Sequence, residues 1–200
     1  MATNRIAASL MGWVLPVGTP GGINAGIDGQ PDGSGTVRLG NEFFCLEPDI
    51  YRLWVATAST PAVRDVLEWA SQEAITDAEL HLRDLDDAGL LISESGFELC
   101  AHTTAMRLIG EILGNGTEPT ARFVVRGNNG VLVAVDPYCY DLMLRIDGVS
   151  PISVYLDSAD RVREKHAHGR AAQALMADLP QLVRARIVRL DAAMPSGGGT

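Results

Sequence analysis

The sequence predicts an α+β protein built from two tandem, duplicated domains, each with a β-ribbon followed by three helices. Three observations favour this architecture: an internal repeat, paired apolar runs around Gly-Asn turns, and helix-start signals after each ribbon. The chain has 200 residues, of which 46% are hydrophobic and 20% charged. This composition is typical of a globular protein that buries a core.

The internal repeat begins at Arg38 and again at Arg126, with the stretches RLGNEFFCLEPDIYRLW and RGNNGVLVAVDPYCYDLM. Both contain Arg, Gly-Asn, an apolar run, an acidic residue with Pro, then Tyr, a charged residue and Leu. Matching stretches extend the repeat on both sides, in the same order. They are LMGWVLPVGTP with LIGEILGNGTEP upstream, and LDDAGLLI with LVRARIVRL downstream.

Several matches in a fixed order indicate a tandem duplication rather than chance similarity. We therefore predict a first domain over residues 1–101 and a second over residues 102–193. Residues 194–200 are expected to form a flexible tail. The Gly-, Asp- and Pro-rich stretch at about residues 20–35 has no counterpart in the second copy and is expected to be a flexible surface loop.

Each copy is expected to contain a two-stranded β-ribbon. In the first copy TVRLG and EFFCLE flank Gly40-Asn41, and in the second Gly-Asn-Asn-Gly separates two β-branched runs. The stretches before the ribbons, RIAASLMGWVL and TTAMRLIGEIL, have apolar residues at helical spacing. They are expected to be helices, with a strand as the alternative for the first.

Helix-start signals follow each ribbon. An acidic residue precedes Pro48 and Pro137, which favours the first turn of a helix, and Pro61 and Pro151 are expected to open a second helix. The second helix of the first copy has apolar residues three and four apart. They are Val63, Val66, Leu67 and Ala70.

The third helix of the first copy has the clearest local signals. Thr76 and Glu79 form the pattern of a capping box, Ile75 and Leu80 that of a hydrophobic staple, and Gly89 supplies a stop. The residues expected to face inward are Leu82, Leu85 and Ala88.

The stretch LLISESGFELC follows this helix and is expected to be a hairpin turning at Ser95-Gly96. Three helices followed by a β-hairpin are the order of a winged helix-turn-helix domain. The sequence thus predicts two such domains in tandem.

The order of motifs resembles a known family. A ribbon, a helix entered through acid-Pro-x-x-Tyr-x-Leu, a Ser/Thr-Pro helix and a third helix ending in Leu-x-x-Ala-Gly-Leu-Leu resembles the RiPP recognition elements, which include the peptide chaperone of pyrroloquinoline quinone biosynthesis. Asp147-Gly148 of the second copy is similar to the helix junction of that family, whereas the first copy has Ala58-Ser59 there. The resemblance implies a non-catalytic domain to which a leader peptide adds as a strand beside the third helix.

The predicted binding site lies in the first copy, between the strand Glu42 to Cys45 and the helix Thr76 to Ala88. One of two Phe residues would supply an apolar pocket, because alternation allows only one of them to face the core, and two Asp residues would form an acidic rim for a cationic partner. The binding residues are Phe43, Phe44, Leu80, Asp84 and Asp87. The predicted function is a peptide- or protein-binding adaptor that recognises a precursor peptide or an enzyme of a biosynthetic pathway.

A DNA-binding transcriptional regulator is the alternative. The net charge of -9 disfavours binding to nucleic acid or anionic membrane, and the third helix of the first copy is acidic. However, residues 1–150 hold 9 basic and 20 acidic side chains, whereas residues 151–200 hold 7 and 5. The regulator would use the basic residues of the second copy, which are Arg161, Arg163, Lys165, Arg170, Arg184, Arg186 and Arg189.

Signals for catalysis, cofactors and metals are weak. The chain has no Gly-x-Ser-x-Gly, no phosphate-binding loop followed by Lys-Ser/Thr and no His-Glu-x-x-His, so neither an enzyme nor a cofactor is expected. Cys100 and His102 could join His166 and His168 in a zinc site, but an inward-facing thiol and a polar His pair are the favoured interpretation. We therefore predict no metal.

The cysteines and aromatic residues point to core positions. The three cysteines, Cys45, Cys100 and Cys139, have wide spacing and are expected to be buried thiols in a reducing, cytoplasmic compartment. Tyr51 and Tyr140 occupy matched positions and are expected to pack in the two cores. The three Trp residues have no aromatic counterpart in the second copy, which makes the first copy the half expected to face a ligand, although core positions are favoured for them too. They are Trp13, Trp54 and Trp69.

Overall fold

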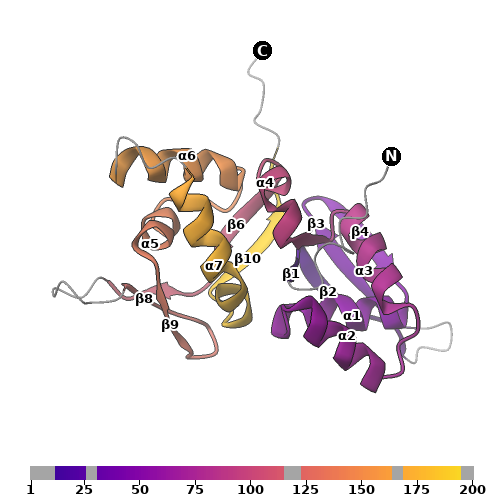
Figure 1. The fold of residues 1–200 in the computed structure, drawn as a ribbon. Coiled ribbons are helices and arrows are strands. Elements are labelled where there is room, and N and C mark those ends of the chain that lie inside the picture. The colour runs from indigo at the N-terminus through magenta and orange to yellow at the C-terminus, as the bar shows by residue number, and fades with distance from the viewer. Residues whose placement is uncertain (1–11, 26–30, 115–122, 164–168, 195–200) are drawn as a thin grey trace, which may run out of the picture. The chain divides into compact units, whose positions relative to one another are not determined.

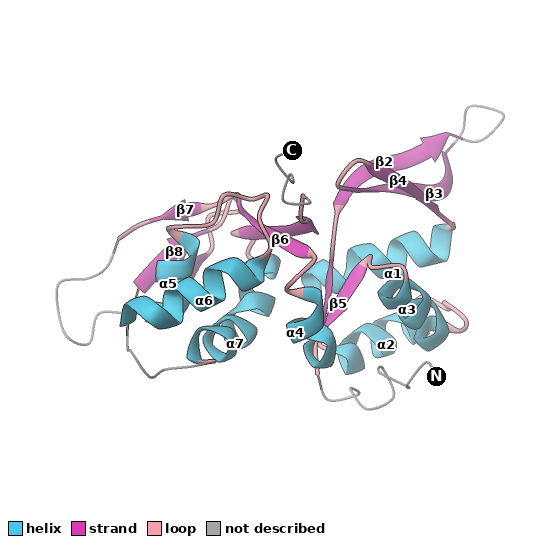
Figure 2. Ribbon diagram, turned by 90° about the horizontal axis from the view of Figure 1, so that it is seen from above, coloured by secondary structure: helices cyan, strands magenta, loops and turns pink. Residues whose placement is uncertain are grey.

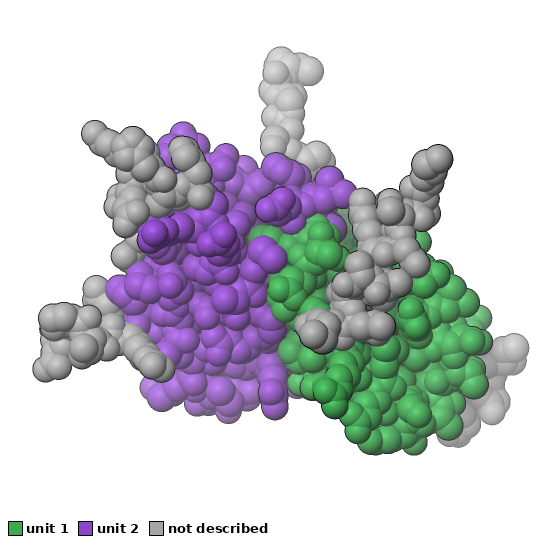
Figure 3. All heavy atoms as spheres, in the orientation of Figure 1, with its two compact units in different colours: residues 1–97 green, residues 98–200 purple. Residues whose placement is uncertain are grey.

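The computed structural model describes residues 12–25, 31–114, 123–163 and 169–194. The chain divides into two compact units, residues 1–97 and residues 98–200 (Figure 3). The described residues form helices and several small antiparallel sheets, so the predicted α+β class is confirmed. Each unit is described below by itself.

Unit 1 contains two antiparallel sheets (Figure 1). The short strand β1 (Val14–Pro16) pairs with β5 (Leu91–Ser93), the last strand of the unit. The larger sheet has the order β2-β3-β4, formed by β2 (Thr19–Ala25), β3 (Pro31–Leu39) and β4 (Glu42–Leu46). Strands β2 and β4 are therefore the two edge strands of this sheet.

Three helices lie between β4 and β5 in the chain: α1 (Pro48–Ser59), α2 (Val63–Gln72) and α3 (Ala78–Asp87). Figure 2 shows α1 running beneath the three-stranded sheet. After β5 come a 3-10 turn (Glu94–Gly96) and the short helix α4 (Phe97–Cys100), which spans the boundary between the units.

The core of unit 1 forms where α1 packs on β3. The Tyr51 ring lies directly against Gly35, so any Cβ at that position would collide with it. Trp54, one turn further along α1, donates a hydrogen bond from Nε1 to the Leu90 carbonyl oxygen at 2.9 Å. Other fully or nearly fully buried members of this core are Val37, Leu53, Val66, Ala70, Leu82, Leu85 and Leu91.

Unit 2 also contains two antiparallel sheets. Strand β6 (Thr104–Leu108) pairs with β10 (Val188–Ala192), and the other sheet has the order β7-β8-β9. Its strands are β7 (Glu111–Ile112), β8 (Phe123–Arg126) and β9 (Leu132–Val135). Strand β9 ends this sheet, as β4 ends the sheet of unit 1.

The helices of unit 2 are α5 (Pro137–Met143), α6 (Ile152–Arg163) and α7 (Arg170–Arg184). The buried apolar residues that they share with the sheets include Met106, Val125, Leu142, Met143, Leu175, Leu179, Leu182 and Leu190. The described elements of both units thus follow the order strand, three strands, three helices, strand.

Several local predictions are confirmed. Gly40-Asn41 turns the β3–β4 hairpin, and Gly-Asn-Asn-Gly joins β8 to β9. Helices α1 and α5 begin at Pro48 and Pro137, where the missing N–H costs no helical hydrogen bond. Gly89, with φ of 72°, follows the end of α3 as expected.

The segments before the ribbons were predicted as helices, which is wrong for their described parts, whereas the strand considered as the alternative for the first segment is confirmed. Val14–Pro16 is strand β1, and TTAMRLIGEIL contains strands β6 and β7; the part of the first segment before Gly12 lies outside the described residues. The physical reason is long-range pairing with β5 and β10, which outweighs a helical spacing of apolar residues.

The ribbons are three-stranded sheets, and the stretch predicted as a surface loop supplies strand β2 and the start of β3. Gly residues interrupt the alternation of apolar and polar side chains that normally marks a strand, so the sequence did not predict the pairing of β2 with β3. The loop tip, residues 26–30, lies outside the described part of the chain.

The predicted capping of α3 is wrong. The helix begins at Ala78 after Asp77, which has φ of 54° and makes no capping side-chain hydrogen bond. The staple is absent as well, because Ile75 is buried while Leu80 is 50% exposed. Ala88, predicted to face inward, is exposed.

The predicted hairpin at Ser95-Gly96 is also wrong. The chain leaves β5 into the 3-10 turn, where the Ser93 hydroxyl accepts a hydrogen bond from the Gly96 N–H at 3.2 Å. This local side-chain bond stabilises a turn that leads into α4 instead of a returning strand.

Candidate functional site

The strand side of the predicted groove is β4. Val37 pairs with Phe44 and Arg38 with Phe43, so the two Phe rings lie on opposite faces of the sheet. Phe44 packs against the core of unit 1, whereas Phe43 is 70% exposed. Phe43 is therefore the ring available at this edge.

The helix side of the predicted groove is the exposed face of α3. Leu80, Asp84 and Asp87 are all exposed there, and Arg83 pairs with Glu79 at 3.8 Å. The buried face of α3 joins the core that also contacts Phe44. None of the five predicted binding residues lines the hollow on α1 in unit 1 or the hollow beside β9 in unit 2.

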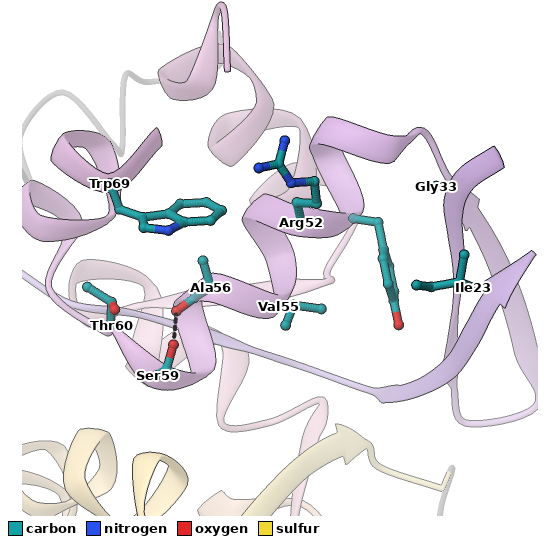
Figure 4. A pocket seen from close by; sticks show the side chains of 9 residues that line it. Ile23, Gly33, Arg52, Val55, Ala56, Ser59, Thr60 and Trp69 are labelled. Atoms are coloured by element: carbon teal, nitrogen blue, oxygen red, sulfur yellow. Dashed lines mark hydrogen bonds between the residues drawn. The ribbon is translucent and has the colours of Figure 1, made fainter. Parts of the chain in front are cut away.

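Unit 1 has a hollow of about 470 Å³ along one flank of α1 (Figure 4). Trp69 of α2 bounds one end and Ile23 of β2 the other, as Figure 4 shows. The lining residues are Ile23, Gly33, Tyr51, Arg52, Val55, Ala56, Ser59, Thr60 and Trp69. Most of this surface is apolar.

Among the described residues that line this hollow, Arg52 is the one cation, and its charge is balanced by carboxylates. Its guanidinium pairs with Asp49 at 3.3 Å and with Glu73, and it lies 6.0 Å from the centroid of the Trp69 ring. The arrangement fixes Arg52 at the rim by two ion pairs and a cation–π contact.

Sequence analysis missed this hollow. Ile23 falls in the Gly-rich stretch that was predicted as a loop, and Trp69 was assigned to the core although it is only partly buried. The unmatched Trp69 was the one available signal. Trp13 and Trp54 are buried, and so are Tyr51 and Tyr140, which confirms their predicted core positions.

Unit 2 has a hollow of about 570 Å³ between β9 and the end of α7. Gln181 donates to Asp178 Oδ1 at 2.9 Å, and Asn129 Oδ1 accepts from the Val131 N–H at 3.2 Å, while the Arg184 side chain is exposed. The lining residues are Asn129, Val131, Leu132, Val133, Ala134, Gln181, Arg184 and Ala185.

The outer edge of β9 presents backbone groups that do not pair with another strand of the described residues. The Gly127 N–H donates to the Val131 carbonyl at 2.9 Å, and the Leu113 N–H of the β7 side donates to the Val124 carbonyl at 3.2 Å. Because hydrogen-bonded and non-bonded pairs alternate in an antiparallel ladder, Leu132 and Ala134 direct their N–H and C=O groups away from β8. Leu132 is also 57% exposed.

A buried polar cluster joins α5 and α7. The Asp136 N–H donates to Asp178 Oδ2 at 2.7 Å. Burial raises the pKa of the Asp178 carboxyl, and burial together with the Asp178 and Asp136 charges raises the pKa of the Cys139 thiol well above its usual value. A thiol held in its neutral form is a poor nucleophile.

The other candidate residues are scattered. Cys100 is half-buried and Cys45 exposed, so the expectation that all three thiols are buried is wrong; Cys45 lies on the outer sheet face beside Asn24. His166 and His168 lie outside the described residues, and the described residues contain no group of three or more metal-ligating side chains. Within the same residues no helix has the length and hydropathy to cross a membrane.

The structure describes the side chains of five of the seven cations considered for DNA binding. Arg184 and Arg186 are exposed near the end of α7, and Arg161 and Arg170 are exposed as well. Arg189 is partly buried in β10. The side chain of Arg163 and all of Lys165 lie outside the described part of the chain.

Comparisons with known proteins give little. No family model matches the chain, and no curated protein matches it. The solved structure of PKMT2 from Rickettsia typhi is similar over 94% of this chain and 44% of that chain, with 11% identity and a TM-score of 0.34. A similarity at that level supports no conclusion about fold or function.

Proposed function

We propose that this chain is a non-catalytic adaptor that binds an extended segment of a peptide or protein as an added strand. The observation that carries the proposal is an edge strand in each three-stranded sheet, β4 in unit 1 and β9 in unit 2, neither of which pairs on its outer side with another strand of the described residues. Edge strands with unpaired N–H and C=O groups bind extended peptides by β-augmentation. A precursor peptide or an enzyme of a biosynthetic pathway is the proposed partner.

The two units are proposed to be copies of one winged-helix-like domain. The matching order of elements supports this, and so do two equivalent single bridges. Trp13 bridges Ala62 at the start of α2, and Ala105 bridges Pro151 at the start of α6. Each bridge ties the first strand of its unit to the same helix junction.

The two edges differ in their surroundings. Phe43, exposed on β4, is proposed as an apolar anchor, and Asp84 and Asp87, exposed on α3, are proposed as acidic residues that attract a cationic partner. Beside β9 a hollow lies next to exposed Leu132 and Arg184. The cytoplasm is the proposed location, where free thiols stay reduced.

Proline at an outward-facing position of each edge tests the proposal. In a two-residue hairpin closed by Leu39 and Glu42, Cys45 directs its N–H outward, as Ala134 does in β9. Cys45→Pro and Ala134→Pro remove a donor from the free edge without removing a ladder bond. The matched controls, Cys45→Ser and Ala134→Ser, keep the N–H.

The measurement is selection of a random 12-residue peptide library on the purified chain, followed by titration of the enriched peptides. We expect at least one Pro variant to weaken binding tenfold or more and its Ser control to leave binding unchanged. Enriched peptides that bind all four variants equally would contradict strand addition. A salt-sensitive shift of random duplex DNA that is lost in Arg184→Ala with Arg186→Ala would instead favour the regulator.

A further inference from the structure

The hollow on α1 is a feature separate from the sheet edges. Tyr51 and Ala56, each 8% exposed, form its floor, whereas Val55 is 45% exposed and Ile23 is 62% exposed on its walls. Large apolar side chains that stay exposed around a concave surface mark a binding site more strongly than scattered ones. Val55 and Trp69 are both among the residues that line the hollow (Figure 4).

The hollow is preformed by packed elements. The Tyr51 ring is stacked 6.1 Å from the Trp54 ring at 18°, and it is wedged against Gly35 of β3. At the other end the last turn of α1 is closed by the Thr60 N–H donating to the Ala56 carbonyl at 2.9 Å. A volume of about 470 Å³ lies within the range of small-molecule sites, about 300–1,000 Å³.

The charges around the hollow select against anionic ligands. Arg52 is paired with Asp49 and Glu73, so an anion would have to compete with two carboxylates for it. An uncharged ligand does not compete for either ion pair of Arg52 and gains from burying the apolar walls.

We propose that this hollow binds a small uncharged molecule with a flat apolar ring system, which packs against Trp69 and Val55. Aromatic ligands gain dispersion and stacking energy against an indole, and the hollow offers aliphatic walls for their edges. The inference is independent of peptide binding by the sheet edges.

The test is titration of the full chain with Nile red, an uncharged ring system whose emission rises in apolar surroundings. We expect saturable binding at one site, and at least tenfold weaker binding in Val55→Arg, which places a charge on the wall, and in Trp69→Ala. Val154→Arg is the matched control, because Val154 is also exposed on a helix but lies in unit 2, and it should leave binding unchanged. Far-ultraviolet circular dichroism checks that all variants are folded.

A second probe separates charge from apolar character. Anilinonaphthalene sulfonate, an anionic ring system, should bind at least tenfold more weakly than Nile red. Equal affinity for the two dyes would overturn the proposed preference for uncharged ligands. Absence of saturable Nile red binding, or equal effects of Val55→Arg and Val154→Arg, would overturn the site.

Discussion

The contact between Gly35 and the Tyr51 ring leaves no space for a side chain in this part of β3. Gly35→Ala should therefore lower the free energy of unfolding by about 1–3 kcal/mol, the usual cost of overpacking. Urea denaturation measures the change. In a Tyr51→Ala background the same substitution should cost clearly less; an equal cost would show that the ring is not the obstacle.

The cysteines differ in accessibility, and this makes a direct prediction. Cys45 is exposed, whereas Cys139 is buried and its pKa is raised. At pH 8 iodoacetamide should therefore modify Cys45 in the folded chain and leave Cys139 unmodified until urea unfolds it. Peptide mass spectrometry of a Cys100→Ser variant gives the two rates. Modification of Cys139 at the rate of Cys45 would show that the α5–α7 cluster opens readily.

At the scale of elements, Asp147 orders the turn between α5 and α6. Its Oδ1 accepts from the Val149 N–H at 2.8 Å and the Ser150 N–H at 2.7 Å, and these bonds, together with one from the Ser150 hydroxyl, lower its pKa well below the usual carboxyl value. A lowered pKa means that the ionised form stabilises the fold above about pH 4 and that this contribution is lost as the pH falls.

Because Asp147 is exposed, solvent screening limits its contribution, and Asp147→Ala should cost about 1 kcal/mol of unfolding free energy at pH 7 and progressively less below pH 4. Urea denaturation from pH 2 to pH 7 measures the difference from wild type. Asp157→Ala, which removes an exposed carboxylate from α6, is the control and should be close to neutral at every pH. If the cost of Asp147→Ala did not change with pH, the hydrogen bonds to the ionised Asp147 carboxylate could not be its cause.

Local signals predicted the elements whose chemistry is local. Gly40-Asn41 and Pro48 mark a turn and a helix start because they act on their own backbone. Strands β1 and β6 are stabilised by pairing with partners about 80 residues away, β5 and β10, and no local pattern contains that information. The Thr76 capping pattern failed because a left-handed Asp77 starts α3 one residue later.

The same distinction applies to the candidate sites. The edge strands could be expected from the sequence, since each is the second arm of a marked hairpin. The hollow of unit 1 could not, because an apolar stripe does not show which of its members will remain uncovered. Trp69 and Val55 belong to different helices, and only the packing of α2 beside α1 places them around one space.

At the scale of the whole molecule, each unit has what a small domain needs to fold. Every sheet in the described residues closes within one unit, and each unit has its own buried apolar core. About 100 residues can bury enough surface for independent stability. Residues 1–97 and residues 98–200, expressed separately, should therefore each show a cooperative thermal transition and dispersed amide resonances.

The fragments also separate the two proposed activities. Nile red binding should remain with residues 1–97, because every residue lining that hollow lies in unit 1. Peptides selected on the full chain should bind the fragment whose Pro variant weakened them. A fragment with no cooperative transition would show that its core depends on the other unit. In that case the two units would share an order of elements but would not be independent domains.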